Sequence, residues 1–173
     1  MKFLSRLLLG TIGGLSATGA MTIAMVKLHK QLPQRDKYPL PPKEITAKLL
    51  READTPMRQE AENRMTMLNH FAYGAAGGAA YFLACPKPES HSIPKGVIYG
   101  IMVWTGSYLG LLPGFGVLKS ATEHSPNRSL LMIAVHLVYG VFLATFTETL
   151  MNDHSRPDGA LIGKSSAPHK DAK

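Results

Sequence analysis

Long uncharged runs separated by clusters of charged residues are the feature that most constrains this chain. Only 18% of its 173 residues are Asp, Glu, Lys or Arg, and these fall almost entirely between runs as long as whole helices. A soluble domain distributes charge over every exposed face, so this segregation indicates that the solvent changes along the chain. The hydrophobic share of 45% would fit a soluble domain, but its distribution predicts an integral, all-α membrane protein.

Four uncharged runs are candidates for transmembrane helices: residues 7–26, 65–85, 96–118 and 129–147. At about 1.5 Å of helical rise per residue, each can cross a hydrocarbon layer of roughly 30 Å. Pro113 and Gly114 are expected to kink or end the third run. The first run has an alternative interpretation as a signal peptide, but it continues through Val26, past any cleavage point. We therefore expect residues 1–151 to form a four-helix membrane domain.

The connection between the first two runs, residues 27–64, is long enough to hold structure of its own. Its first part contains four prolines between Gln31 and Pro42, which favour an extended, polyproline-like course and disfavour helix. From residue 43 to 64, apolar residues recur at helical spacing and predict an amphipathic helix that breaks near Pro56. We expect this helix to lie on the lipid interface, with a partner-docking arm as the alternative. Residues 152–173 are polar and predict a disordered tail.

Charge and cysteine content exclude several classes of protein. The net charge is +7, but the basic residues form no compact stripe with interleaved aromatic residues, which disfavours nucleic-acid binding. Cys85 is the single cysteine, so a disulfide scaffold is excluded. The sequence also shows no nucleophile motif of a hydrolase. The basic residues flank the predicted spans instead, and their balance near the span ends slightly favours a cytoplasmic position for residues 27–64 and 119–128.

The second and fourth runs share a short string, His70-Phe-Ala-Tyr73-Gly74 and His136-Leu-Val-Tyr139-Gly140. Positions i and i+3 lie on one face of a helix, so each run presents an imidazole and a phenol in the same direction. Both histidines lie about 8–10 Å below the same membrane surface, as judged by helical rise. Ionisable groups inside a span usually face an interior, so we expect His70 and His136 to lie near each other in a polar intramembrane site.

The chemistry of this site stays open at the level of sequence. The two imidazoles could form structural hydrogen bonds, ligate haem, relay protons, or bind a metal together with Glu123 or His124. Other polar or aromatic residues that could support the site are Arg64, Asn69, Trp104, Tyr108, His124 and Arg128. Two glycine pairs at helix-contact spacing, Gly10 with Gly14 and Gly74 with Gly78, predict close packing of the first two spans.

Several motifs together resemble a known group of proteins. They are Gly19-Ala-Met-Thr22, Tyr38-Pro-Leu-Pro-Pro42, Trp104-Thr-Gly-Ser-Tyr-Leu-Gly-Leu-Leu-Pro113 and the two histidine strings. This combination is similar to small, poorly characterised bacterial inner-membrane proteins of the YagU-like type. The resemblance implies a multi-pass inner-membrane protein linked to acid or envelope stress, with no defined reaction and no catalytic residues.

Three functional readings follow from these observations. The first is a structural or stress-related membrane protein whose immediate partner is the lipid bilayer. The second is an accessory subunit that binds a larger membrane complex or a second copy of itself. The third is a haem- or metal-binding protein that uses His70 and His136.

Overall fold

The computed structural model of the chain describes residues 3–85 and 92–154, and this described part is helical with no β-strand. The all-α prediction is therefore confirmed. The elements, in chain order, are α1 (Phe3–Gln31), η1 (Gln34–Asp36), α2 (Pro41–Glu52), α3 (Gln59–Ala84), α4 (Ser92–Thr105), η2 (Gly106–Leu111), α5 (Leu112–Gly114), η3 (Ala121–Glu123) and α6 (Pro126–His154).

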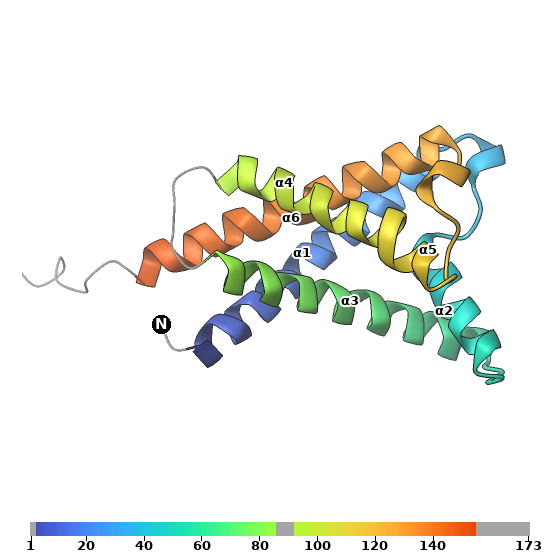
Figure 1. Cartoon of the computed structure of the whole chain (residues 1–173), viewed down its shortest axis with the longest axis horizontal. Coiled ribbons are helices and arrows are strands. Elements are labelled where there is room, and N and C mark those ends of the chain that lie inside the picture. Colours follow the sequence, from blue (N-terminus) through green and yellow to red (C-terminus); the bar gives the residue numbers. More distant parts are fainter. Residues whose placement is uncertain (1–2, 86–91, 155–173) are drawn as a thin grey trace, which may run out of the picture.

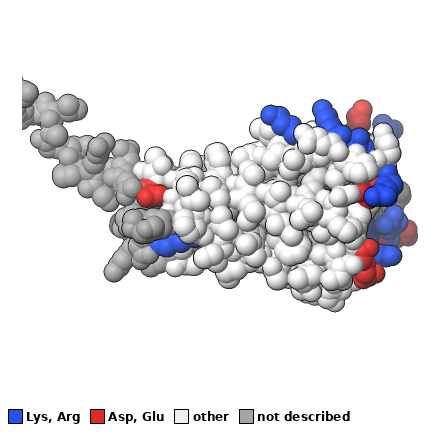
Figure 2. Space-filling model, turned by 90° about the horizontal axis from the view of Figure 1, so that it is seen from above, with Lys and Arg blue, Asp and Glu red and all other residues white. Residues whose placement is uncertain are grey.

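Three helical segments are long and apolar enough to cross a membrane: Phe3–Gln31, Ser92–Gly114 and Pro126–Leu150. The chain is therefore a membrane protein. Figure 2 shows a broad uncharged surface along the long axis of the molecule, with most of the visible charged side chains gathered at one end. Helix α3 is of comparable length, but Glu60, Glu62 and Arg64 occupy its first two turns, and it is not among the three.

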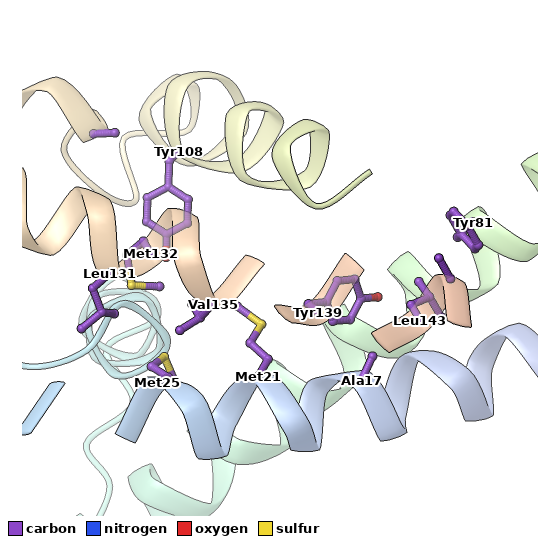
Figure 3. Close-up of a cluster of buried hydrophobic side chains, with 12 residues drawn as sticks. Ala17, Met21, Met25, Tyr81, Tyr108, Leu131, Met132, Val135, Tyr139 and Leu143 are labelled. Atoms are coloured by element: carbon purple, nitrogen blue, oxygen red, sulfur yellow. The ribbon is translucent and has the colours of Figure 1, made fainter. Parts of the chain in front are cut away.

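The long helices form two antiparallel pairs that meet through α1 and α6. Helix α1 packs along α3, α4 packs along α6, and α1 also contacts α6. Figure 1 shows α3 and α4 on opposite sides of this arrangement, with α1 and α6 between and behind them. The buried core lies mainly along the α1–α6 contact, where Figure 3 shows Ala17, Met21 and Met25 of α1 near Met132, Val135, Tyr139 and Leu143 of α6.

Glycines allow both antiparallel pairs to pack closely. The structure places Gly10 and Gly14 of α1 against Gly74 and Gly78 of α3, and a Cβ atom added to Gly10 would lie 2.7 Å from the carbonyl oxygen of Gly78. In the other pair, Gly96 and Gly100 of α4 lie against the α6 backbone around Gly140. We did not predict this second contact, although Gly96 and Gly100 have the same four-residue spacing.

The first connection is less extended than we predicted. Only residues 32–33 and 37–40, on either side of η1, are non-helical before α2, because Pro41 and Pro42 occupy the first turn of α2. Proline is compatible with that position, where the missing N–H would have no helical partner and the fixed φ suits a helix. The break after α2 does contain Pro56, as expected, but residues 59–64 belong to α3 and not to the amphipathic helix.

Two predicted boundaries also shift. The third run stops being helical after Gly114, so Pro113 and Gly114 end it before residue 118. Helix α6 continues to His154 and includes the first three residues of the segment predicted as a tail. The rest of that predicted tail, residues 155–173, lies outside the described residues.

Candidate functional site

A cavity of about 660 Å³ lies between α3 and α4. Its back is formed by Met21 and Met25 of α1 and by Met132 of α6, and its end is covered by Pro42 and Ile45 of α2. We call it the α3–α4 cavity. The backbones of α3 and α4 stay apart, whereas each packs along another long helix. The cavity therefore occupies the place where a fully packed four-helix bundle would have a further helix contact.

The mouth of the cavity opens sideways, between α3 and α4. Its lining includes side chains that are also exposed on the outer surface: Tyr73 is 53% exposed, Met102 is 63% exposed and Leu111 is 50% exposed. Ala76 on α3 is likewise an exposed lining residue. These residues lie within the apolar lengths of their helices, so the mouth faces the side of the bundle and not its charged end.

The four residues predicted as a polar site all line this cavity: His70 and Tyr73 from α3, and His136 and Tyr139 from α6. The Nδ1 atom of His136 lies 2.7 Å from the carbonyl oxygen of Met132, a distance that fixes the orientation of this imidazole. The Nε2 atom of His70 is buried and has no hydrogen-bond partner among the described residues. The structure describes no direct hydrogen bond between the two imidazoles. Both line one cavity, and any closer contact between them stays a prediction.

The two tyrosines of the shared string make different contacts. Tyr139 donates its hydroxyl hydrogen to the carbonyl oxygen of Gly74, at 2.6 Å, and so ties α6 to α3. The hydroxyl of Tyr73 lies 2.8 Å from Oγ of Ser107. Ser107 donates its own hydrogen to the carbonyl oxygen of Val103, so Tyr73 must be the donor in this contact. The Tyr73–Ser107 bond reaches from α3 to η2 beside the cavity mouth.

A second tyrosine bridge crosses between the same two sides of the cavity. The hydroxyl of Tyr99 on α4 donates to the carbonyl oxygen of Gly77 on α3, at 2.6 Å. We did not predict Tyr99 or Ser107 as site residues, because Tyr99 has no motif signal and Ser107 appears only as one member of the motif from Trp104 to Pro113. Side chains, and not close backbone packing, thus hold α3 and α4 in register.

The π-helical segment η2 turns Ser107 and Tyr108 inward, and both side chains are buried. Such segments are rare and occur frequently at functional sites. The ring of Tyr108 packs edge-to-face on the imidazole of His136, with 5.7 Å between the ring centres. Trp104, one turn earlier, stacks on Tyr108 at 6.4 Å and is partly buried. These two predicted supporting residues therefore adjoin the site.

The remaining supporting residues have different positions. Asn69 lines the cavity next to His70, whereas Arg64 is exposed and does not line it. His124 and Glu123 line a separate, more open pocket at the charged end. The structure therefore does not bring them to the histidine pair, which removes the metal site that combined His70 and His136 with Glu123 or His124. The described residues contain no group of three or more His, Cys, Asp or Glu side chains that could hold a metal ion.

Arg128 is the centre of a second cluster, which we call the Arg128 cluster: Tyr38, Pro39, Glu44, His124 and Arg128. The Arg128 side chain is 2% exposed and donates to the carbonyl oxygens of Tyr38 at 3.0 Å and Pro39 at 2.5 Å. Its Nη2 also lies 3.1 Å from a carboxylate oxygen of Glu44 on α2. The guanidinium carbon lies 3.6 Å above the centre of the Tyr38 ring. Arg128 thus fastens the first connection and α2 to the start of α6.

Two further contacts hold the same connection in place. The Tyr38 hydroxyl lies 3.0 Å from Nδ1 of His124. Burial raises the pKa of this hydroxyl. Asn127 donates to the Asp36 carboxylate at 2.9 Å, and this hydrogen bond lowers the pKa of Asp36. The apolar side of α2 is consequently held over the end of the α3–α4 cavity.

Comparison with known proteins yields one match. The sequence profile of a family described as "Family of unknown function (DUF6789)" matches residues 4–158, which is most of the chain and includes every residue of the cavity. No curated protein and no solved structure matches the chain.

Proposed function

The chain belongs to the family of unknown function DUF6789, and we propose that it is a four-span membrane protein that binds a lipophilic molecule in the α3–α4 cavity. One observation carries this proposal: a cavity of about 660 Å³ whose mouth opens between the uncharged parts of α3 and α4. Ligand sites are typically concave, mostly apolar and of this size, and they carry a few convergent polar groups. The α3–α4 cavity has each of these properties.

The position of the mouth favours a ligand that arrives from the bilayer. The exposed residues around it, including Tyr73, Ala76 and Met102, belong to helix lengths without charge. A molecule dissolved in the hydrocarbon layer can reach this opening without crossing water. At roughly 30 Å³ per small group, the volume accommodates on the order of twenty non-hydrogen atoms, comparable to one short lipid chain with its polar end.

Helix α3 is the proposed fourth span. It packs along α1 through Gly74 and Gly78, and its length from residue 65 to 84 carries no charge. The charged first turns lie at the same end of the molecule as α2, where charged side chains would meet the lipid headgroups. Helix α1 is long and apolar enough to cross the membrane. We therefore expect the uncharged part of α3, which packs along α1, to lie in the same bilayer.

The four-span arrangement predicts that the two ends of α3 lie on opposite sides of the membrane. A reporter fused after Asp54 should therefore give the opposite location from a reporter fused after Glu89. A further reporter after Glu123 should match the one after Asp54. The locations can be measured with paired enzymatic reporters that are active on one side only. The same location for the fusions after Asp54 and Glu89 would contradict the fourth span.

Binding can be measured through Trp104, the single tryptophan of the chain. Trp104 stacks on Tyr108, which lines the cavity, so a brominated molecule inside the cavity should quench its fluorescence. We expect saturable quenching of the purified protein by a brominated single-chain lipid. Its unbrominated counterpart should reverse the effect. Quenching from the surrounding lipid would instead rise without saturation.

Two alanines on α3 provide matched variants for this measurement. Ala76 lines the mouth, and Ala76→Phe should obstruct it and reduce saturable quenching. Ala72 is exposed one turn earlier and does not line the cavity, so Ala72→Phe should leave the quenching unchanged. Quenching that never saturates, or that is equal in both variants, would contradict the proposed binding function.

Haem binding is a second candidate for the same cavity, although a haem has about twice as many non-hydrogen atoms as this volume accommodates, so the helices would have to move apart to admit it. It is favoured by His136, whose Nδ1 is held at the Met132 carbonyl so that Nε2 is left for another partner. Ligating histidines commonly have their second nitrogen held in this way, and His70 would be the second ligand. A Soret band in the purified protein that is lost in His136→Ala would identify haem in place of a lipid.

The resemblance to YagU-like proteins supplies the proposed setting. It supports a proposed location in the bacterial inner membrane and a proposed structural or stress-related role, for which lipid binding would be the molecular activity. The second predicted reading, an accessory subunit of a larger complex, stays a prediction. Proteins that co-purify in mild detergent would identify such a partner.

A further inference from the structure

We infer that the molecule bound in the α3–α4 cavity is an uncharged lipid that carries a hydroxyl or carbonyl oxygen, that Tyr108 donates to this oxygen, and that His136 accepts from it where it is a hydroxyl. This inference rests on the proposed binding function and narrows it to one chemical class. It follows from the charge of the cavity lining and from which polar groups are already paired.

The cavity lining contains no charged residue. Among the described residues that form it, none is Lys, Arg, Asp or Glu. A phosphate or carboxylate bound inside would lose its hydration without gaining a counter-ion, which is strongly unfavourable in an apolar surrounding. The lining therefore favours a neutral ligand over a fatty acid anion or the headgroup of a phospholipid.

Most hydroxyl groups of the lining are already paired within the protein. Tyr99 and Tyr139 donate to helix carbonyl oxygens, and Tyr73 donates to Ser107. Thr18 donates to the carbonyl oxygen of Gly14 at 2.7 Å. These groups stabilise the walls of the cavity and gain little from a ligand.

Tyr108 and His136 are exceptions, and a third is His70, whose Nε2 has no hydrogen-bond partner among the described residues. Tyr108 is only 6% exposed, lines the cavity, and has no hydrogen bond from its hydroxyl to any residue that the structure describes. His136 uses only Nδ1 within that same part of the chain, so its Nε2 is uncommitted. Their rings are in edge-to-face contact at 5.7 Å, and Figure 3 shows the Tyr108 ring extending from its helix toward Met132 of α6.

Polar groups inside a protein are nearly always hydrogen-bonded. Two uncommitted groups on adjacent side chains of the lining can therefore bind a polar group of a ligand. A phenol hydroxyl is a donor, and an imidazole nitrogen is a donor or an acceptor according to its tautomer. Because Nδ1 of His136 donates to the carbonyl oxygen of Met132, Nε2 of the neutral imidazole is an acceptor. A hydroxyl therefore accepts from Tyr108 while it donates to His136, whereas a carbonyl oxygen accepts from Tyr108 alone. The side chain of Asn69, on the same lining, adds an amide that can serve either role.

The inference is tested by competition against the brominated probe that quenches Trp104. Four competitors with the same chain length are compared at pH 8: an alkane, a primary alcohol, a methyl ketone and a carboxylic acid, which is ionised at this pH. We expect the alcohol and the ketone to displace the probe at about ten-fold lower concentration than the alkane and the carboxylate. The alcohol and the ketone also distinguish a hydroxyl ligand from a carbonyl ligand, because only the alcohol can donate a hydrogen bond.

Two tyrosines give a matched pair of variants. Tyr108→Phe removes the uncommitted hydroxyl and keeps the ring, so it should reduce the preference for the alcohol over the alkane by about three- to ten-fold, the effect of one neutral hydrogen bond. Tyr81→Phe removes a hydroxyl from another buried tyrosine that does not line the cavity, and should leave this preference unchanged.

The outcomes distinguish this inference from the proposed function. Saturable quenching in which alkane and alcohol compete equally would support lipophile binding but overturn the oxygen contact. Preferential displacement of the probe by the carboxylate would show that the ligand is not neutral. An equal loss of affinity for all four competitors in Tyr108→Phe would show that Tyr108 forms no hydrogen bond with the ligand oxygen. Failure of every probe to give saturable quenching would contradict the proposed function itself.

Discussion

Replacement of Arg128 with methionine is expected to lower the free energy of unfolding by about 3–5 kcal/mol, the cost of breaking a buried ion pair from one side. The Arg128 side chain is 2% exposed, and its partner Glu44 is 23% exposed. Methionine would leave the Glu44 carboxylate and the carbonyl oxygens of Tyr38 and Pro39 without their donor. Unfolding in mixed micelles, followed by the fluorescence of Trp104, measures the loss.

The control for this prediction is another arginine at the same end of the molecule. Arg51 on α2 is exposed and forms no ion pair that the structure describes, so Arg51→Met should change stability by less than about 0.5 kcal/mol. Glu44→Gln combined with Arg128→Met should cost less than the sum of the single changes, because the two side chains interact. Equal effects of Arg128→Met and Arg51→Met would show that the cluster does not hold the first connection.

Replacement of Gly14 with leucine is expected to abolish the folded bundle, and even Gly14→Ala should lower the free energy of unfolding by about 1–3 kcal/mol. A Cβ atom at Gly14 would collide with the carbonyl oxygen of Gly74 and lie 3.0 Å from the Cα atoms of Ala75 and Gly78. These are backbone atoms, which cannot move aside without separating α1 from α3. Thermal unfolding in detergent, monitored by the loss of monodisperse protein, measures the effect.

Gly19 provides the matched control within the same helix. A Cβ atom added at Gly19 meets no other atom within 4 Å. Alanine there should stabilise α1 slightly, by up to about 1 kcal/mol, because glycine is the more flexible residue inside a helix. If Gly14→Ala is no more destabilising than Gly19→Ala, the close packing of α1 on α3 is wrong.

Several features of the site could be predicted from the sequence because they depend on local spacing. The shared strings around His70 and His136 place an imidazole and a phenol on one helical face, and the four residues do line one cavity. The pairing of Tyr73 with Ser107 could not be predicted in this way. It depends on the π-helical segment η2, which turns Ser107 inward and leaves no recognisable pattern in the sequence.

His124 and Arg128 also show which properties could be predicted from the sequence and which depend on the tertiary structure. His124 and Arg128 precede the fourth run, and their sequence position alone predicts only that they lie near the membrane surface. Their contacts come from Tyr38 and Glu44, which are 86 and 84 residues away along the chain respectively. An ion pair between such distant residues has no local signature, so the sequence could not assign Arg128 to the first connection instead of the histidine pair.

By itself, the sequence determined that this chain is a helical membrane protein and determined which faces of its helices are polar or small. These properties follow from the local alternation of apolar, charged and glycine residues, which acts over one or two helical turns. Only the tertiary structure decided that α3 and α4 stay apart and enclose a cavity. The physical reason is that the separation of two helices is set by all the side chains packed behind them, here those of α1 and α6, and not by the pattern of either helix alone.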